Sequence, residues 1–123
     1  MAESNAPDWP AHLPPLGPMA PIPYVMSYTA SEFARMRQGF APRDMDDRWA
    51  VYYAGDELRF YRTWGGPCIY WLQCSEHDNL YHVAKAMVAT GGGYRRMPDA
   101  EEVAFLDRLI RVVLLGDSDP RSP

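Results

Sequence analysis

The chain has 123 residues, with sixteen acidic and twelve basic side chains and a net charge of −4. This length predicts one domain with a modest core, and the acidic balance argues against the clustered Lys and Arg of a nucleic-acid-binding face. No basic stretch precedes an apolar one near the N-terminus, and no apolar run reaches the ~20 residues of a membrane span. We therefore expect a cytoplasmic protein without membrane contact, and two cysteines are too few for a disulfide framework.

Residues 1–23 are predicted to form an arm that precedes the domain. Seven of the twelve prolines fall in this segment, which therefore cannot sustain a helix or a central strand. We expect an extended polyproline-II or disordered arm, which is either a docking segment for a partner or a solvated tail. The domain itself is predicted to span residues 24–116, followed by a tail over residues 117–123.

The first predicted helix spans about residues 30–38. Thr29 and Glu32 have the spacing of a capping box, and Gly39 stands where a left-handed C-cap belongs. The helix is short, so packing of Phe33 and Met36 rather than helix propensity must stabilise it.

Four aromatic and aliphatic runs predict the strands of an antiparallel meander. Residues 54–57 and the sequence Gly65-Gly66-Pro67 are turn signals, and the polar residues 75–79 separate the third strand from the fourth. Side-chain alternation places Cys68 on the same face as Tyr70, Leu72 and Cys74. The expected strands cover residues 49–53, 58–64, 68–74 and 80–89.

The last predicted helix begins at Asp99, where Glu102 repeats the capping-box spacing, and ends at Gly116. An apolar stripe gives this helix one face for the sheet. The predicted fold class is α+β: a four-stranded antiparallel β-meander packed against a C-terminal helix, with a short N-terminal helix and a Pro-rich N-terminal arm. The stripe comprises Val103, Leu106, Leu109, Ile110, Val113 and Leu114.

Two groups of residues have side chains that bind metals, and we predict that neither forms a metal site. The loop 43–48 contains three aspartates but no glycine turn or later glutamate of a Ca²⁺ loop. Cys68 and Cys74 lie about 20 Å apart if they share one strand, so they cannot share a zinc ion. Cys74 with His77 or His82 is the one local candidate for nucleophilic chemistry. We expect no catalytic set and no cofactor.

The loop 90–98 is the first candidate ligand site. Gly91, Gly92 and Gly93 allow close backbone approach, Arg95 and Arg96 can bind a phosphate, and a helix N-terminus follows. The ligand-binding residues predicted in this loop are Tyr94, Arg95 and Arg96.

Arg62 is the second candidate, because an arginine between Phe60 and Trp64 on one strand face is costly to bury unless it is paired. It is either a structural arginine, stacked or paired with Asp46 or Asp47, or part of an Arg-aromatic pocket for an anion or a planar ring. Arg62 and Trp64 therefore join the predicted ligand-binding residues.

The segments M-D-D-R-W (45–49), R-T-W-G (62–65) and L-L-G (114–116) carry a resemblance. The chain resembles a small uncharacterised bacterial domain family with a tryptophan strand, an R-S-W-T-G-like segment and a closing helix that ends in leucines, from about Phe33 to Gly116. Thr63 stands for the usual serine and Gly65 for the usual threonine. Members of this family sometimes accompany ADP-ribose-processing proteins, which implies no established activity but makes Arg48, Arg62 and Trp64 candidates for testing.

Three functions follow as hypotheses. The first is a non-catalytic interaction protein, such as a toxin-neutralising immunity protein or an accessory subunit, whose protein partner would contact aromatic residues of the sheet. The second is a small-ligand module that binds a nucleotide or an ADP-ribose-like phosphate. A hydrolase that uses Cys74 is a third reading. The residues predicted for the protein interface are Tyr52, Tyr53, Tyr61 and Trp71, with Tyr70 of the same type.

Overall fold

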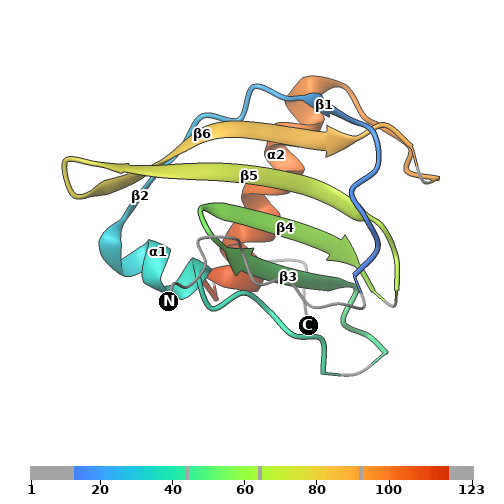
Figure 1. The fold of residues 1–123 in the computed structure, drawn as a ribbon, viewed down its shortest axis with the longest axis horizontal. Coiled ribbons are helices and arrows are strands. Elements are labelled where there is room, and N and C mark those ends of the chain that lie inside the picture. Colours follow the sequence, from blue (N-terminus) through green and yellow to red (C-terminus); the bar gives the residue numbers. More distant parts are fainter. Residues whose placement is uncertain (1–12, 44, 64, 92, 117–123) are drawn as a thin grey trace, which may run out of the picture.

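The computed structural model describes residues 13–43, 45–63, 65–91 and 93–116. They form an antiparallel sheet of six strands, in the order β1-β6-β5-β4-β3, with β2 also paired to β6. Figure 1 shows the sheet in front of helix α2. None of the helices in these ranges is long and apolar enough to cross a membrane. The elements are β1 (Met19–Pro21), β2 (Ser27–Thr29), α1 (Ala30–Met36), β3 (Trp49–Ala54), β4 (Glu57–Arg62), β5 (Cys68–His77), β6 (Leu80–Ala89), α2 (Asp99–Leu109) and η1 (Ile110–Leu114).

The α+β class and the antiparallel sheet are confirmed, and the sheet is larger than the predicted meander. β1 pairs with Met87–Ala89 at one end of β6, and β2 pairs with residues 80–82 at the other end. β1 belongs to the segment predicted as an arm, and Ile22 just after it is buried in the main core. Prolines are compatible with this position because β1 is an edge strand. Residues 1–12 and 117–123 lie outside the described residues.

The hairpin between β5 and β6 is longer than predicted. β5 continues to His77, and only Asp78 and Asn79 form the turn. Both turn residues have positive φ, 55° and 64°, which is the conformation of a tight two-residue hairpin. The polar residues 75–77 therefore belong to the strand and not to a loop.

Because of a β-bulge, the side chains of β5 do not all lie on the faces of the sheet that the sequence predicted. Phe60 is paired with Tyr70, and Tyr61 with Cys68, so Ile69 is an extra residue on β5. As a result Cys68 lies on the opposite face from Tyr70, in a small cluster with Ala50 and Tyr61. The prediction that Cys68 shares a face with Tyr70 is therefore wrong.

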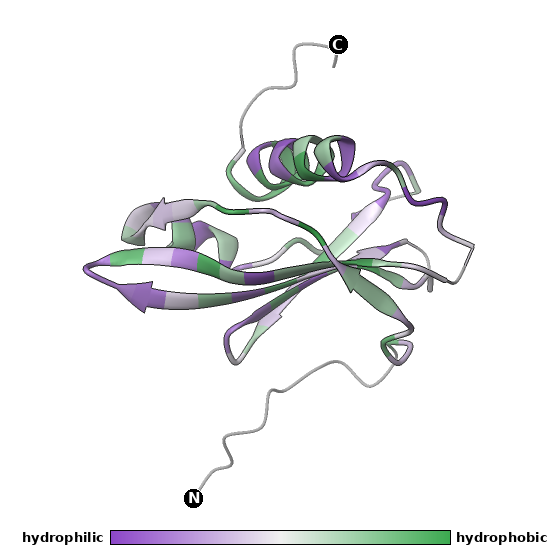
Figure 2. Cartoon of the chain, turned by 90° about the horizontal axis from the view of Figure 1, so that it is seen from above, coloured by the Kyte–Doolittle hydropathy of each residue, from purple (hydrophilic) through white to green (hydrophobic). Residues whose placement is uncertain are grey.

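The two faces of the sheet have different surroundings. α1 and α2 cover one face and enclose the main core, as Figure 2 shows from above for α2. No described helix covers the other face, which we call the helix-free face. Leu13 packs there against the small cluster of Ala50, Tyr61 and Cys68.

Helix α1 has the predicted capping box. The Glu32 amide donates to Thr29 Oγ1 at 3.1 Å, and the Thr29 amide donates to Glu32 Oε1 at 2.9 Å. Phe33 is buried and stacks on Tyr81 with a centroid distance of 4.3 Å. Gly39, with φ 66°, turns the chain toward β3.

The capping box predicted for the last helix is wrong. The N-cap of α2 is Pro98, and no side chain caps the helix. Glu102 is instead fully buried against the sheet. The helix continues into η1 and ends before Gly116, as predicted, with a hydrogen bond from the Leu115 amide to the Ile110 carbonyl.

Candidate functional site

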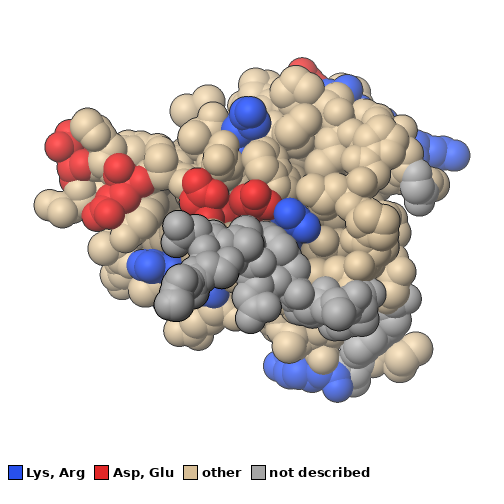
Figure 3. Space-filling model, in the orientation of Figure 1, with Lys and Arg blue, Asp and Glu red and all other residues tan. Residues whose placement is uncertain are grey.

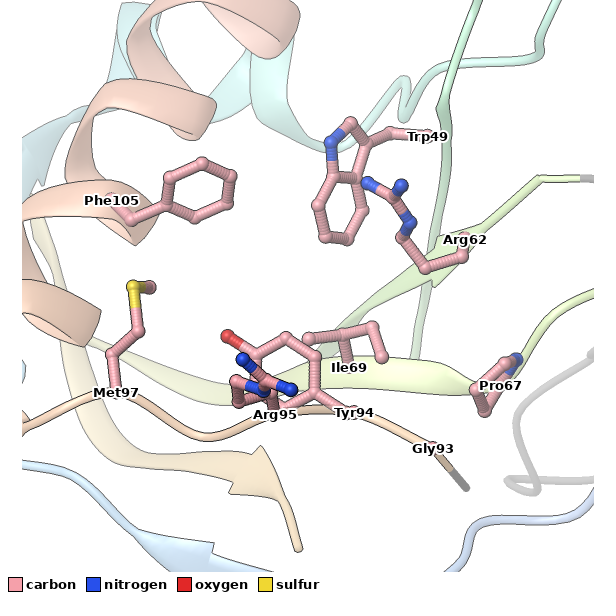
Figure 4. A pocket seen from close by; sticks show the side chains of 9 residues that line it. All are labelled: Trp49, Arg62, Pro67, Ile69, Gly93, Tyr94, Arg95, Met97 and Phe105. Atoms are coloured by element: carbon pink, nitrogen blue, oxygen red, sulfur yellow. The ribbon is translucent and has the colours of Figure 1, made fainter. Parts of the chain in front are cut away.

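A pocket of about 420 Å³ lies where the hairpin of β3 and β4, the start of β5, the loop 90–98 and α2 meet. We call this the aromatic pocket, and residues 90–98 the pocket loop. Its residues come from segments far apart in the sequence, as Figure 4 shows. The pocket is lined by Trp49, Arg62, Pro67, Ile69, Gly93, Tyr94, Arg95, Met97 and Phe105.

Trp49 and Arg62 form one side of the pocket because they are cross-strand partners in the β3–β4 hairpin. The Arg62 guanidinium lies 5.0 Å from the centre of the Trp49 ring, within cation–π range. A turn holds the Arg62 backbone, since its amide donates to the Pro67 carbonyl and its carbonyl accepts from Gly66. Arg62 is therefore a stacked arginine, and its aromatic neighbour is Trp49.

Phe105 extends the aromatic surface from α2. Its ring centre lies 6.1 Å from that of Trp49, and Figure 4 shows both rings beside the cavity. Phe105 is 39% exposed and is one of the few exposed large apolar side chains in the described residues. An exposed aromatic ring at a pocket is available to contact a flat ligand.

Two arginines, Arg62 and Arg95, line the aromatic pocket. Within the described residues, neither Arg62 nor Arg95 forms an ion pair with a carboxylate. The predicted pairing of Arg62 with Asp46 or Asp47 does not occur, and Asp47 instead accepts hydrogen bonds from Arg43. The pocket thus offers two guanidinium groups to an anion.

A buried carboxylate holds the pocket loop. Glu102 accepts hydrogen bonds from the Tyr70 hydroxyl at 2.5 Å, the Tyr94 hydroxyl at 2.8 Å and the Met97 amide at 2.9 Å. Burial and the hydrogen bond to Glu102 raise the pKa of Tyr70, and burial is also the main cause of the raised pKa of Tyr94. Both phenols therefore remain protonated donors at neutral pH.

The structure brings three of the predicted ligand-binding residues together: Arg62, Tyr94 and Arg95. Arg96 does not line the pocket and pairs with Asp99 at 2.6 Å. Arg48 is exposed, and its backbone carbonyl accepts a hydrogen bond from the Thr63 amide. Trp64 and Gly92 lie outside the described residues.

Sequence reasoning missed Trp49, Met97 and Phe105. The sequence could have indicated Trp49, because a hairpin turn at residues 54–57 places it directly opposite Arg62. The sequence could also have indicated Phe105, since it is an aromatic residue that falls outside the apolar stripe of its helix. No sequence pattern indicated Met97.

The N-terminus of α2 does not provide the anion site that the pocket loop suggested. Its first turn carries Asp99, Glu101 and Glu102, and these carboxylates offset the positive end of the helix dipole. An anion in the aromatic pocket would therefore bind to the arginines and not to the helix end.

The residues predicted for a protein interface are split between the two faces. Tyr52, Tyr61 and Trp71 lie on the helix-free face, but Tyr61 is only 2% exposed. Tyr53 lies on the opposite face against Phe33, and Tyr70 is fully buried. Figure 3 looks onto the helix-free face, where Lys and Arg side chains are scattered rather than gathered in one patch.

Cys74 does not have the surroundings of a nucleophile. Burial raises the pKa of its thiol to about 12, which suppresses the reactive thiolate. Within the described residues no hydrogen bond joins it to His77 or His82, and His82 Nδ1 lies 2.7 Å from the Ser27 hydroxyl instead. The described residues also contain no group of three or more His, Cys, Asp or Glu side chains that could hold a metal ion.

No family model, no curated protein and no solved structure matches this chain. The resemblance to a bacterial domain family therefore stays a prediction, and the evidence about function is the geometry of the molecule itself.

Proposed function

We propose that the protein binds a small organic anion with a flat apolar body in the aromatic pocket. The observation that carries this proposal is the combination of two arginines, Arg62 and Arg95, with the aromatic rings of Trp49, Tyr94 and Phe105 in one cavity. Ligand sites typically combine an apolar lining with a few polar groups that orient the ligand. Here the arginines would orient the anionic group, and the rings would contact the flat body.

The size of the pocket narrows the ligand class. About 420 Å³ lies near the lower end of the ~300–1,000 Å³ range of small-molecule sites. One ring system with one anionic group would fill such a cavity. A mononucleotide belongs to this class, whereas an ADP-ribose-like ligand with two sugars and two phosphates would extend beyond the cavity.

A matched series of probes tests the proposal. Isothermal titration calorimetry would compare naphthalene-2-sulfonate, naphthalene-2-carboxylate and 2-naphthyl phosphate with neutral 2-naphthol and with inorganic phosphate. We expect at least one of the aromatic anions to bind with a Kd below about 1 mM, and both controls to bind at least about tenfold more weakly. The proposal fails if no aromatic anion gives heat, or if 2-naphthol binds as tightly as the anions.

A protein partner on the helix-free face is the second candidate function. The supporting observation is a groove of about 340 Å³ lined by Leu16, Met19, Trp71 and Met87, beside the Glu57–Arg59 ion pair. Trp71 donates to Glu57 at 2.8 Å, which fixes its ring at the groove, and such a tryptophan can anchor an interface. An immunity protein or accessory subunit would use a surface of this kind.

Co-purification tests this candidate. Protein isolated from its native host should elute with a stoichiometric partner, and Trp71→Ala should release that partner while Phe105→Ala in the aromatic pocket retains it. Elution without a partner, or release by both variants alike, would argue against an interface on the helix-free face.

A further inference from the structure

We infer that Glu102 is a positioning residue that holds the pocket loop in its ligand-binding arrangement. The effect on ligand affinity rests on the proposed function, whereas the effect on the loop does not. Glu102 lies behind the pocket loop and does not line the aromatic pocket itself.

The burial of Glu102 is the first observation. Its exposed fraction is 0%, and it is the one charged residue among the fully buried side chains of the described core. A buried carboxylate is costly unless hydrogen bonds satisfy it. The other buried side chains on this face of α2 are apolar. We therefore expect Glu102 to have a specific role there.

The partners of Glu102 are the second observation. Oε1 accepts from the Tyr70 and Tyr94 hydroxyls, and Oε2 accepts from the Tyr94 hydroxyl at 3.0 Å and the Met97 amide at 2.9 Å. Tyr94 and Met97 line the aromatic pocket. One side chain of α2 therefore fixes two residues of the pocket loop, on both sides of Arg95.

The pocket loop has few other attachments. Its first residue, Thr90, donates to the Pro18 carbonyl, and the Tyr94 amide donates to Gly91 within the loop at 3.3 Å. Residues 93–97 also form hydrogen bonds to the sheet and to α2. In the described part of the chain these bonds go to Glu102 and Tyr70, apart from the exposed Arg96–Asp99 pair. The position of Arg95 in the pocket thus depends on Glu102.

Two substitutions of Glu102 should disturb the pocket loop to different extents. Glu102→Leu removes both acceptors and leaves the Met97 amide without its partner. Glu102→Gln retains one acceptor at nearly the same size, so it protects against simple loss of folding. Tyr70→Phe is the matched control: it removes the Tyr70 hydroxyl and with it the 3.3 Å contact to the Tyr94 hydroxyl, but it keeps the bonds from Tyr94 and Met97 to Glu102. Glu101→Gln controls for charge, since Glu101 is exposed in the same helical turn.

The first readout needs no ligand. Amide hydrogen exchange of Met97, followed by NMR, should accelerate at least about tenfold in Glu102→Leu, because the amide loses a buried acceptor. It should remain within about twofold of the parent rate in Tyr70→Phe and Glu101→Gln. Unchanged Met97 exchange in Glu102→Leu would overturn the inference.

The second readout is the Kd of the tightest aromatic anion from the naphthalene series. We expect about a tenfold loss of affinity in Glu102→Leu, a smaller loss in Glu102→Gln, and less than about twofold in Tyr70→Phe. Equal losses in Tyr70→Phe and Glu102→Leu would show a general effect of core stability and overturn the positioning role. If the parent protein binds no probe, the proposed function fails, and the Met97 exchange still decides the role of Glu102.

Discussion

Arg62 places a positive charge beside an aromatic ring at the aromatic pocket. An arginine between apolar residues of a strand predicted either a structural pairing or a ligand site. The structure shows it stacked on Trp49, without a carboxylate partner in the described residues. A guanidinium group held in this way is oriented for a ligand before the ligand arrives.

Substitution of Arg62 tests the stacked guanidinium directly. Arg62→Gln should weaken binding of the aromatic anion by about tenfold or more, since a charge-assisted hydrogen bond contributes about 1.5–3 kcal/mol. Arg62→Lys should lose part of the affinity, because lysine keeps the charge but not the flat fork. Calorimetry would measure both. Arg96→Gln is the control, and the same loss there would contradict the assigned site.

The buried thiols and phenols predict alkaline sensitivity. Burial raises the pKa of Cys68, Cys74 and Tyr28 each to about 12. The unfolded chain releases these protons near the ordinary values of about 8.5–10, whereas the folded chain retains them. The contribution of these groups to the free energy of unfolding should therefore be constant below about pH 8.5 and fall as the pH rises toward 12, by up to about 1.4 kcal/mol per pH unit for each group.

Urea unfolding at a series of pH values measures this decline. Cys68→Ala should show a shallower decline than the parent protein, because one group no longer contributes. A free energy of unfolding that is constant or rising between about pH 9 and 11 would contradict the assigned burial.

At the scale of elements, helix α1 depends on its capping box. Thr29→Ala removes the acceptor of the Glu32 amide, and a lost N-cap costs about 0.5–2 kcal/mol. We expect a loss of about 1 kcal/mol in the free energy of unfolding, measured in urea. Ser31→Ala, at an exposed position of the same helix, should change it by less than about 0.5 kcal/mol. Equal effects of the two substitutions would show that the cap contributes nothing.

The turn after α1 makes a second prediction. Gly39 has φ 66°, and a Cβ placed there would lie 2.3 Å from the Val51 carbonyl oxygen. Gly39→Ala should therefore lower the free energy of unfolding by at least about 2 kcal/mol, since the left-handed conformation alone costs about 1–2 kcal/mol. Gly17→Ala, where a Cβ meets no atom within 4 Å, is the control. A chain that tolerates Gly39→Ala as well as Gly17→Ala would contradict this backbone conformation.

The elements that could be predicted are those with a local signal. Alternating strands, the hairpin of β3 and β4 and the capping box of α1 all depend on residues within a few positions of one another. The β-bulge at Ile69 and the pairing of β1 with β6 depend on contacts between distant segments, and no local pattern indicates them. Glu102 shows the same limit, because its spacing from Asp99 fits a cap while its actual partners are Tyr70, Tyr94 and Met97.

At the scale of the whole molecule, the fold separates two surfaces. α1 and α2 cover one face of the sheet (Figures 1 and 2). The aromatic pocket lies beside α2, between the pocket loop and the hairpin of β3 and β4. The helix-free face carries Tyr52 and Trp71. A small ligand and a protein partner would thus use different surfaces, so their effects can be measured independently.

Three of the nine residues that line the aromatic pocket were predicted as ligand-binding residues. Arg62 was predicted because an arginine between apolar strand residues is costly to bury unless it is paired. Tyr94 and Arg95 were predicted because they follow three glycines that allow the backbone to approach a ligand, and because arginine binds phosphate. Their assembly with Trp49 and Phe105 depends on how α2 crosses the sheet. That crossing follows from the packing of the whole core and not from any single segment.

The most direct measurement of the central claim is an NMR titration of the ¹⁵N-labelled protein with naphthalene-2-sulfonate. Binding in the aromatic pocket predicts concentration-dependent shifts of the Trp49 indole N–H and of the Arg62, Gly93 and Arg95 amides, with little change at Trp71 on the helix-free face. Shifts confined to Trp71 and its neighbours, or no shifts at about 5 mM ligand, would contradict the claim.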